Sequence, residues 1–427
     1  MSRPRRSSNL GADIRGDMNA PAISTLLPSP PKQLPSKNRH RLLSRQRRKA
    51  RSLLGKWIDL SFRHTWVNPL VLLLLIVSAY LVNPTPENPV HHAIFLSYPL
   101  PPDPVANPTG PTRYGKGKWD IAFVAFYTIF LSFTREFLMQ RLLKPMALYF
   151  DIKGRNKQNR FMEQAYTAIY FAVFGPFGLY VMSQTDIWYF NTAAFYEGFP
   201  HTSHGAAFKA YYLLEASYWA QQAIVLLLQL EKPRKDFKEL VGHHIITLAL
   251  IALSYRFHFT HMGLAVYITH DISDFFLATS KTLNYLNSSI VGPYFGMFVC
   301  HWIYLRHYLN LKILWSILTE FRTVGPFQLN WKAGQYKCLI SQAITFALLA
   351  SLQAVNLFWL FLILRIAKRY LFSRGLEDER SDDEESGDEA REKGAGKMKE
   401  DIKIILNGEV VANGHLDSAI SREKKNI

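Results

Sequence analysis

The sequence predicts an all-α integral membrane protein with about eight transmembrane helices. Apolar runs of roughly 17–25 residues, the length of a membrane span, recur between positions 67 and 366. Several short connections between these runs are rich in lysine and arginine, as is typical of loops on the cytosolic side. Both ends of the chain are polar and lack a hydrophobic period, so the apolar centre sets the fold class.

The predicted spans follow one another with short connections. They are Val67–Val82, Trp119–Leu138, Glu163–Met182, Ala206–Leu230, two spans within His243–Lys281, Pro293–Leu314 and Ser341–Ile366. Gly175-Pro176 in the third span predicts a kink or a break, because proline removes a helical hydrogen bond. Proline and glycine mark residues 83–118 as a loop, and residues 315–340 are expected to form a mixed loop.

Charge gives the expected topology. An even number of spans puts both ends on one side, and the basic connections 140–160 and 231–239 then share the cytosolic side with them. The sequon at Asn287 falls on that side too and is expected to stay unmodified. The net charge of +17 follows this bias, so no nucleic-acid partner is expected. Cys300 and Cys338 lack metal-site spacing and are expected to be free thiols.

The chain thus divides into four regions. Residues 1–66 are a disordered basic cytosolic segment, and 67–118 hold the first transmembrane helix and a proline-rich luminal loop. Residues 119–370 form a helical domain with the remaining spans, and 371–427 are a disordered acidic cytosolic tail.

Three features of the two terminal regions predict interactions. The basic stretch Arg39–Arg51 is a topology determinant or a contact for anionic lipid. Ser381 and Ser386 are each followed by acidic residues and resemble sites for an acidophilic kinase. Lys424-Lys425, near the end of the chain, resembles a dilysine retrieval signal, so the endoplasmic reticulum membrane is the expected location.

Ionisable residues inside the fifth and sixth spans form the candidate site. His243-His244 begins one span, while Asp271 and Asp274 lie in the other, and charge at this depth is costly enough to indicate function. The bend between the spans is centred near Phe257, so His243 and Asp271 each lie roughly 21 Å from it. Antiparallel helices would bring them to one depth, with both aspartates on one face. A carboxylate beside an imidazole suits a general base or a histidine nucleophile.

Three alternative roles for these residues are less well supported. A buried histidine can simply hydrogen-bond a neighbour, but four ionisable residues at matching depth disfavour that role. His258 and His261 have metal-ligand spacing, yet His258 lies about 22 Å from His243 along a helix, so no metal site is expected. A transporter's ion relay would accompany an inverted repeat, and none is evident.

Four further residues are candidates for substrate contact. Arg306 and His307 lie in the seventh span, where Arg306 pairs with a carboxylate, contacts a phosphate or snorkels to the surface. Tyr218 and Trp219 lie in the fourth span, where interfacial anchoring or packing is the alternative role.

The central stretch resembles the signature of ceramide synthases of the TLC-domain family, fungal type. The matching segment is HHIITLALIALSYRFHFTHMGLAVYITHDISDFFLATSKTLNYL, and FYEGFPHTSHGAAFKAYYLLEASYW and WIYLRHYLNLKILWSIL on either side are also similar. The resemblance covers roughly residues 120–370 and lacks the homeobox-like insert of many animal members. His243, His244, Asp271 and Asp274 match residues that are essential in the family.

The resemblance implies that residues 119–370 are a TLC catalytic domain, a helical bundle enclosing a long lipid cavity. It implies an enzyme that transfers a fatty acyl group from acyl-CoA to the amine of a sphingoid base, either dihydrosphingosine or phytosphingosine. Acyl-CoA is then a substrate, and no cofactor is expected. Association with a small single-span regulatory subunit is also implied, and both homo- and hetero-dimers are compatible with it.

Two questions stay open on sequence alone. Basic residues outside the spans are expected to attract the CoA phosphates or else to set topology, namely Arg155, Lys157, Arg160, Lys232, Arg234 and Lys235.

The intact histidine and aspartate set favours an enzyme over a non-catalytic TLC-domain protein that senses lipid or assists translocation. Whether His243 or His244 reacts, and whether it carries the acyl group or only a proton, is undecided.

Overall fold

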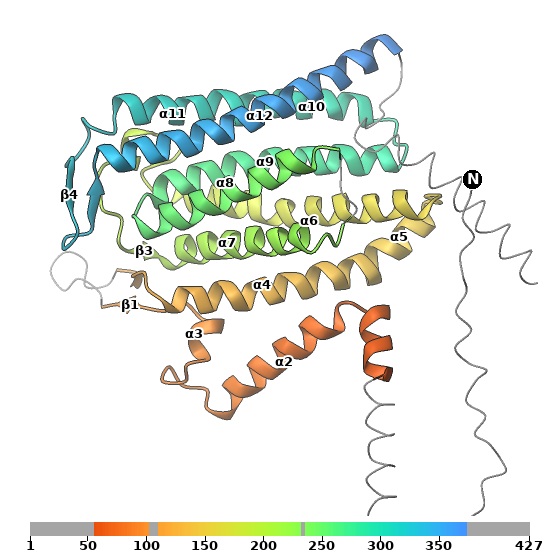
Figure 1. The fold of residues 1–427 in the computed structure, drawn as a ribbon, viewed down its shortest axis with the longest axis horizontal. Helices are drawn as coiled ribbons and strands as arrows, with labels where there is room; N and C mark the ends of the chain where they lie inside the picture. Colours follow the sequence, from red (N-terminus) through yellow and green to blue (C-terminus); the bar gives the residue numbers. More distant parts are fainter. Residues whose placement is uncertain (1–54, 102–109, 232–234, 374–427) are drawn as a thin grey trace, which may run out of the picture. The chain divides into compact units, whose positions relative to one another are not determined.

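The computed structural model describes residues 55–101, 110–231 and 235–373. The chain divides into two units, residues 1–59 and Leu60–Ile427, and the second unit carries the fold. Within the described ranges this second unit is mostly helical and has two small antiparallel sheets (Figure 1). The predictions made for Arg39–Arg51, Ser381, Ser386 and Lys424-Lys425 lie outside the described residues.

The long helices run roughly side by side in the second unit (Figure 1). The α-helices are α2 (Val67–Val82), α3 (His91–Ile94), α4 (Trp119–Leu138), α5 (Lys144–Tyr149), α6 (Arg155–Ser183), α7 (Ala206–Leu227), α8 (Phe237–Arg256), α9 (Thr260–Tyr285), α10 (Val291–Ile303), α11 (Asn310–Thr319) and α12 (Leu339–Ser373). Two π-helical segments, η1 (Met139–Leu143) and η3 (Tyr304–Leu309), join α4 to α5 and α10 to α11, and η2 (Ala193–Phe195) is a short 3-10 turn.

Both sheets are built from the connections between helices and lie at the same end of them in Figure 1. The first sheet pairs β1 (Pro99–Leu100) with β2 (Arg113–Tyr114), and β2 with β3 (His204–Gly205). The second is a hairpin of β4 (Gln328–Asn330) and β5 (Gln335–Lys337). The first sheet therefore ties the segment before α4 to the segment before α7, and the second closes the connection between α11 and α12.

The predicted spans are helical, but the prediction for the connection 140–160 was wrong. Residues 140–160 were expected to form a loop, whereas η1, α5 and the first turns of α6 occupy most of that segment. Long side chains such as arginine and lysine are good helix formers, so a basic run is compatible with helix as well as with loop. Gly175-Pro176 does not break α6, which continues through Pro176 to Ser183.

Four helices in the described part of the chain are long and apolar enough to cross a membrane. They are Trp119–Tyr149, Arg155–Ser183, Phe237–Arg256 and Leu339–Phe372, and a fifth span results if the bent pair Gly55–Arg63 and Val67–Val82 counts as one. The chain is therefore a multi-pass membrane protein by length and composition. Helices α7 and α9 are present but are not among these four. Both carry buried polar side chains, which lower their mean hydropathy.

Helix α9 packs against α6, α8, α10 and η3. Gly178 of α6 lies close to side chains of α7 and α9. A Cβ at this position would lie 2.6 Å from the hydroxyl of Tyr211 and 3.0 Å from Ile268. Close approach of α6 thus depends on the missing side chain at Gly178. Helix α8 packs against α7, α9 and α12, and this group of helices encloses the candidate site.

Candidate active site

His243 lies on α8 and is buried among aromatic and imidazole rings. Ring centroids of Trp359, Trp219 and His244 lie 5.1, 5.6 and 5.8 Å from that of His243. The ring of His270, on α9, is 6.5 Å away and nearly parallel. The Nδ1 atom of His243 has no hydrogen-bond partner among the described residues. The histidine is thus held by packing on several sides, and no side chain or carbonyl in the described part of the chain occupies its Nδ1.

Two cavities share His243 in their walls, and the second carries more polar and charged side chains than the first. A cavity of about 230 Å³, here called the apolar cavity, is lined mainly by aliphatic and aromatic side chains of α8, α9 and α12 and by the β4–β5 hairpin. A second cavity of about 170 Å³, here called the polar cavity, is lined by Gln164, Thr167, Gln222, Asp236, His244, Asp274, Lys281 and Arg306 among others. His243 and Trp219 line both.

The apolar cavity follows α8 toward its C-terminal end. It is lined by Leu250, Ser254 and Phe257 along that helix and by Trp331 and Tyr336 near the hairpin. From His243 to Phe257 an α-helix rises roughly 21 Å, so the lining extends over more than half of a hydrocarbon core that is about 30 Å thick.

His244 faces the polar cavity and has a fixed tautomer. Its Nδ1 lies 2.9 Å from the carbonyl oxygen of Leu240, which can only accept, so Nδ1 carries the hydrogen. His244 lines the polar cavity and not the apolar one, whereas His243 lines both. Two adjacent residues of a helix point about 100° apart, and this separation sends the two histidines to different surroundings.

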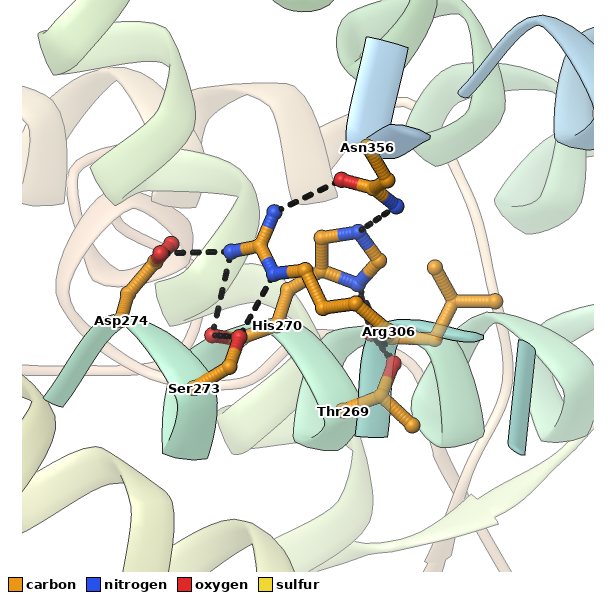
Figure 2. A network of polar contacts seen from close by, with 7 residues as sticks. Thr269, His270, Ser273, Asp274, Arg306 and Asn356 are labelled. Carbon is orange, nitrogen blue, oxygen red and sulfur yellow. Dashed lines mark hydrogen bonds and ion pairs between the residues drawn. The ribbon is translucent and has the colours of Figure 1, made fainter. Parts of the chain in front are cut away.

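Asp274 forms an ion pair with Arg306 inside the protein. The guanidinium Nη2 donates to Asp274 Oδ1 at 2.5 Å, and Nε donates to the hydroxyl of Ser273 at 2.6 Å (Figure 2). The guanidinium also stacks 4.3 Å from the ring centre of Trp302. Arg306 lies in the π-helical segment η3, and such segments often occur at functional sites. Of the three roles left open for Arg306 by the sequence, the structure shows the pairing with a carboxylate.

Asn356 of α12 joins His270 to Arg306. Its Oδ1 accepts a bond of 3.0 Å from Arg306 Nη1, and its Nδ2 lies 3.4 Å from His270 Nε2 (Figure 2). The other ring nitrogen, Nδ1, lies 2.8 Å from the carbonyl oxygen of Val266 and so carries the hydrogen. His270 is therefore held as a neutral imidazole whose Nε2 accepts, next to the ring of His243.

Asp271 lies at the expected level but points to a different partner. Tyr211 of α7 donates a bond of 2.5 Å to Asp271 Oδ2, while Oδ1 has no hydrogen-bond partner among the described residues. The neighbouring His270, and not Asp271, approaches His243. The arithmetic of depth was sound, but the rotation of α9 about its own axis cannot be obtained from the distance to the bend.

The remaining candidates for substrate contact have separate environments. Tyr218 stacks on Tyr170, with centroids 3.8 Å apart, and lines the polar cavity. His307 is buried and its Nδ1 accepts a bond of 2.7 Å from Gln353. Trp219 and Arg306 line cavities, whereas His307 appears in the lining of neither.

The basic residues expected to attract CoA begin helix α6 or precede α8. Arg155 and Lys157 lie in the first turn of α6, and Arg160 pairs with Glu163 at 3.1 Å one turn later. Lys235 is among the described residues, whereas Lys232 and Arg234 lie outside them. Within the described chain these residues do not line the polar cavity, whose basic side chains are Lys281 and Arg306.

The histidines near the bend lie apart from His243. His258 Nδ1 is 3.3 Å from Lys116 Nζ, and burial lowers the pKa of His258 to about 4. His261 stacks on His201, with centroids 3.6 Å apart, and burial lowers the pKa of His201 to about 3. No group of three or more metal-binding side chains is found among the described residues.

Comparison with known proteins decides the family. Residues 160–365 match the TLC domain model. The chain is 54% identical to sphingosine N-acyltransferase lac1 of Schizosaccharomyces pombe over 80% of this chain and 88% of that protein. It is 47% identical to ceramide synthase LAG1 of Saccharomyces cerevisiae over 92% of this chain and 95% of that protein.

The chain belongs to the ceramide synthase, or sphingosine N-acyltransferase, family of TLC-domain enzymes. A likeness of 55% identity to the sphingosine N-acyltransferase-like protein FUM17 of Gibberella moniliformis, over 76% of this chain and 84% of that protein, agrees. The matched TLC segment holds α7, α8, α9, η3 and most of α12, the elements that build both cavities.

Sequence reasoning did not find three residues that complete the site. His270 lies in the segment ITHDISD and was overlooked beside the aspartate that follows it. Glu215 of α7 and Asn356 of α12 are polar residues within apolar helices, a signal that applies to them as much as to Asp271. Glu215 and Asn356 are both fully buried.

Proposed function

We propose that this chain is a ceramide synthase that transfers a fatty acyl group from acyl-CoA to the amine of a sphingoid base. The observation that supports this reaction best is the position of His243 in the wall shared by the two cavities. A substrate with an apolar chain on one side of its reacting carbon and a polar carrier on the other matches that arrangement. Acyl-CoA has this chemistry, with the thioester at the junction.

In this proposal the acyl chain lies in the apolar cavity and the CoA side of the thioester in the polar one. Burial of each methylene group contributes about 0.8 kcal/mol, so a long chain gains much of its binding energy there. Amide and hydroxyl groups of Gln164, Thr167 and Gln222 offer hydrogen bonds on the polar side. Lys281 provides a cation inside this cavity, and Arg155, Lys157, Arg160 and Lys235 would attract the CoA phosphates from outside it.

Two routes through His243 fit the surroundings. As a general base, the neutral imidazole takes a proton from the sphingoid ammonium, and the amine attacks the thioester carbon as the C–S bond breaks. As a nucleophile, His243 attacks first, releases CoA and carries the acyl group until the amine displaces it. His244 faces the polar cavity. In either route it would exchange a proton with the CoA leaving group or with the amine.

Asp274 and Arg306 support the polar wall in both routes. Their ion pair neutralises the aspartate and fixes the guanidinium through four contacts. His270 and Asn356 hold the parallel neighbour of His243 in one tautomer. We propose that this network keeps His243 neutral and correctly oriented. A fixed environment of this kind lowers the reorganisation needed during reaction.

We extend the proposal to the setting of the enzyme. About eight membrane spans with both termini cytosolic would open the polar cavity toward cytosolic acyl-CoA, because His243 lies near the end of α8 that follows the basic connection. An endoplasmic reticulum location, a small single-span subunit and a dimeric assembly belong to the same proposal. A sphingoid base would enter from the lipid bilayer.

Release of free CoA thiol tests the reaction. Purified protein in detergent, given acyl-CoA and a sphingoid base, is expected to release one thiol for each ceramide formed. Folded protein that releases no thiol would contradict the proposal. Intact-mass analysis after acyl-CoA alone separates the two routes, since an added acyl mass that is absent in His243→Ala indicates the nucleophile.

The matched variant is His244→Ala. It is expected to retain the acyl adduct if His243 is the nucleophile and to lose it if His244 is. No adduct in active wild-type protein would favour the general-base route.

A further inference from the structure

Glu215 is a buried carboxyl that the two routes above leave unused. It lies on α7 with no exposed surface, and Tyr170 of α6 donates a hydrogen bond of 3.0 Å to its Oε1. Its second oxygen, Oε2, makes no hydrogen bond of good geometry among the described residues, although the indole of Trp219 comes within reach of the carboxyl. Burial of an unsatisfied carboxyl oxygen is costly, so its presence in a native interior calls for a reason.

Asp271 repeats this pattern on the facing helix. It also has no exposed surface, one oxygen accepts from a tyrosine, and the other is without a partner among the described residues. Tyr211, which donates to Asp271, lies one helical turn before Glu215 on α7, so the two carboxyls lie near the same side chain, and they interact as like charges. Adjacent buried carboxyls cannot both ionise at neutral pH at reasonable cost, so the two together hold at least one proton. Glu215 and Asp271 are here called the carboxyl pair.

Other charged and titratable groups surround the carboxyl pair. Tyr170 and Tyr211 donate to it, Tyr218 lies close on α7, and Asp274 and Arg306 act on Asp271 from α9 and η3. Arg306 is already committed to Asp274 through their ion pair.

Two residues connect the carboxyl pair to the cavities. Trp219 lies one helical turn after Glu215 on α7, and Tyr267 lies one turn before Asp271 on α9, so each shares a face with its carboxyl. Both line the apolar cavity, and Trp219 packs 5.6 Å from His243. The hydroxyl of Tyr267 and the indole nitrogen of Trp219 make no hydrogen bond of good geometry among the described residues. Tyr267 interacts electrostatically with both carboxyls.

The proposed reaction needs a proton acceptor beyond the imidazole. A sphingoid ammonium loses two protons when it becomes an amide nitrogen: one ends on the CoA sulfur and one is released. In a site lined by apolar and aromatic side chains, water is a poor sink for that second proton. A carboxylate that already shares a proton with its neighbour can accept another, leaving both groups neutral.

We propose that Glu215, together with Asp271, accepts the proton that the sphingoid ammonium loses during acyl transfer, and that it acts through Tyr267 or His243 without touching the substrate. The N–H bond of the ammonium breaks and an O–H bond forms on the carboxyl pair, with the hydroxyl of Tyr267 or the imidazole of His243 between them. The neutral amine then attacks the acyl carbon, and the pair returns its proton to solvent before the next turnover. This inference rests on the proposed acyl transfer.

Glu215→Gln tests the inference through the pH dependence of its defect. The amide keeps an oxygen for the hydroxyl of Tyr170 but cannot take up a proton. At pH 7 the variant is expected to turn over about 100-fold more slowly than wild type, a typical loss for a proton-transfer group. The neutral fraction of an aliphatic amine rises roughly 300-fold between pH 7 and pH 9.5. The defect is therefore expected to shrink to below about 5-fold at pH 9.5, where less deprotonation is needed.

Glu320→Gln is the matched control. Glu320 accepts a hydrogen bond of 3.0 Å from Thr192 and also has a buried oxygen without a partner among the described residues, but it lies beyond the end of α11, away from both cavities. It is expected to keep wild-type turnover within about twofold at both pH values. Glu215→Asp, which keeps a carboxyl, is expected to recover a large part of the activity.

The outcomes separate this inference from the proposed function. A Glu215→Gln defect of the same size at both pH values indicates a structural role and overturns the inference, as does wild-type activity at pH 7. Absence of thiol release by the wild-type protein would instead reject the acyl transfer itself. If Glu215→Gln does not fold, Tyr267→Phe provides the second test, with an expected loss of about tenfold at pH 7 that also shrinks at pH 9.5. A loss independent of pH in that variant overturns the inference.

Discussion

Asn356 Nδ2 lies 3.4 Å from His270 Nε2, and this contact couples the histidine beside His243 to the buried guanidinium of Arg306. The asparagine is the only link from α12 to the imidazole of His270 among the described residues, and it satisfies a guanidinium N–H as well.

The first prediction concerns Asn356→Leu. The variant removes both hydrogen bonds at similar side-chain volume, leaving His270 Nε2 and one N–H of Arg306 unpaired. Each buried unpaired group costs about 1–3 kcal/mol, so the unfolding temperature should fall, and turnover should fall by about tenfold or more as His270 loses its orientation. Thiol release and thermal unfolding in detergent measure the two effects. Ser351→Ala on the exposed side of α12 is the control and should behave as wild type.

The second prediction concerns the ion pair of Asp274 and Arg306. Asp274→Asn or Arg306→Met leaves one buried partner uncompensated, which typically destabilises by about 3–5 kcal/mol. The double variant should be less destabilised than the sum of the two, because no isolated charge remains. Unfolding free energies in a double-mutant cycle provide the test. Strict additivity would show that the pair contributes nothing to stability beyond its separate contacts.

The fold was predictable from the sequence because membrane spans are recorded in continuous apolar runs. Val67–Val82 and Trp119–Leu138 were predicted at the bounds that α2 and α4 have in the structure. The basic segment from 140 to 160 was not, since charge marks the side of a membrane and does not distinguish loop from helix. The mean hydropathy of α9 is likewise too low to mark it as a membrane span, because polar residues of the candidate site take the place of apolar ones.

The candidate site was predictable in its residues but not in its pairing. The depth of His243 and Asp271 followed from the rise of a helix, and the contact of His243 with His270 bears out that level. A rotation of one residue, about 100°, decides whether His270 or Asp271 faces α8, and only packing against α6 and α7 fixes it. Glu215 was not found for the same reason. Its importance depends on the side-chain contacts between α7 and α9, which place Asp271 near it, and the sequence does not give those contacts.

The third prediction concerns Gly178→Ala. A Cβ at this position would lie 2.6 Å from the hydroxyl of Tyr211, the donor to Asp271, and 3.0 Å from Ile268. Tyr211 must shift and weaken its bond to Asp271, so turnover should fall by about tenfold while the protein still folds, at a cost of about 1–3 kcal/mol. Gly296→Ala on α10 has no neighbour within 4 Å and serves as the control. Unchanged activity in Gly178→Ala would show that the Tyr211 bond is dispensable.

The fourth prediction concerns the pH dependence of stability at Lys116, outside the membrane spans. Burial lowers the pKa of Lys116 to about 7, while Asp120 opposes this effect and Lys209 adds to it. Its Nζ donates to the carbonyl of Tyr255 at 3.4 Å and lies 3.3 Å from His258 Nδ1. Because the unfolded chain has a lysine pKa near 10.4, it binds more protons than the folded protein between about pH 7 and pH 10. Stability contributed by this residue therefore rises with pH in that window, and its burial penalty is fully present below pH 7.

Lys116→Met removes the buried charge and hence the pH-dependent penalty. The unfolding temperature of the variant minus that of wild type should be most positive near pH 6 and should fall by several degrees by pH 9.5, whatever constant loss comes from the missing hydrogen bonds. The titration of His258 does not interfere, since its folded pKa of about 4 and its ordinary value both lie below most of this window. Lys118→Met, exposed two residues further on, should track wild type at every pH. A difference for Lys116→Met that stays constant from pH 6 to pH 9.5 would mean that Lys116 keeps an ordinary ammonium in the folded protein.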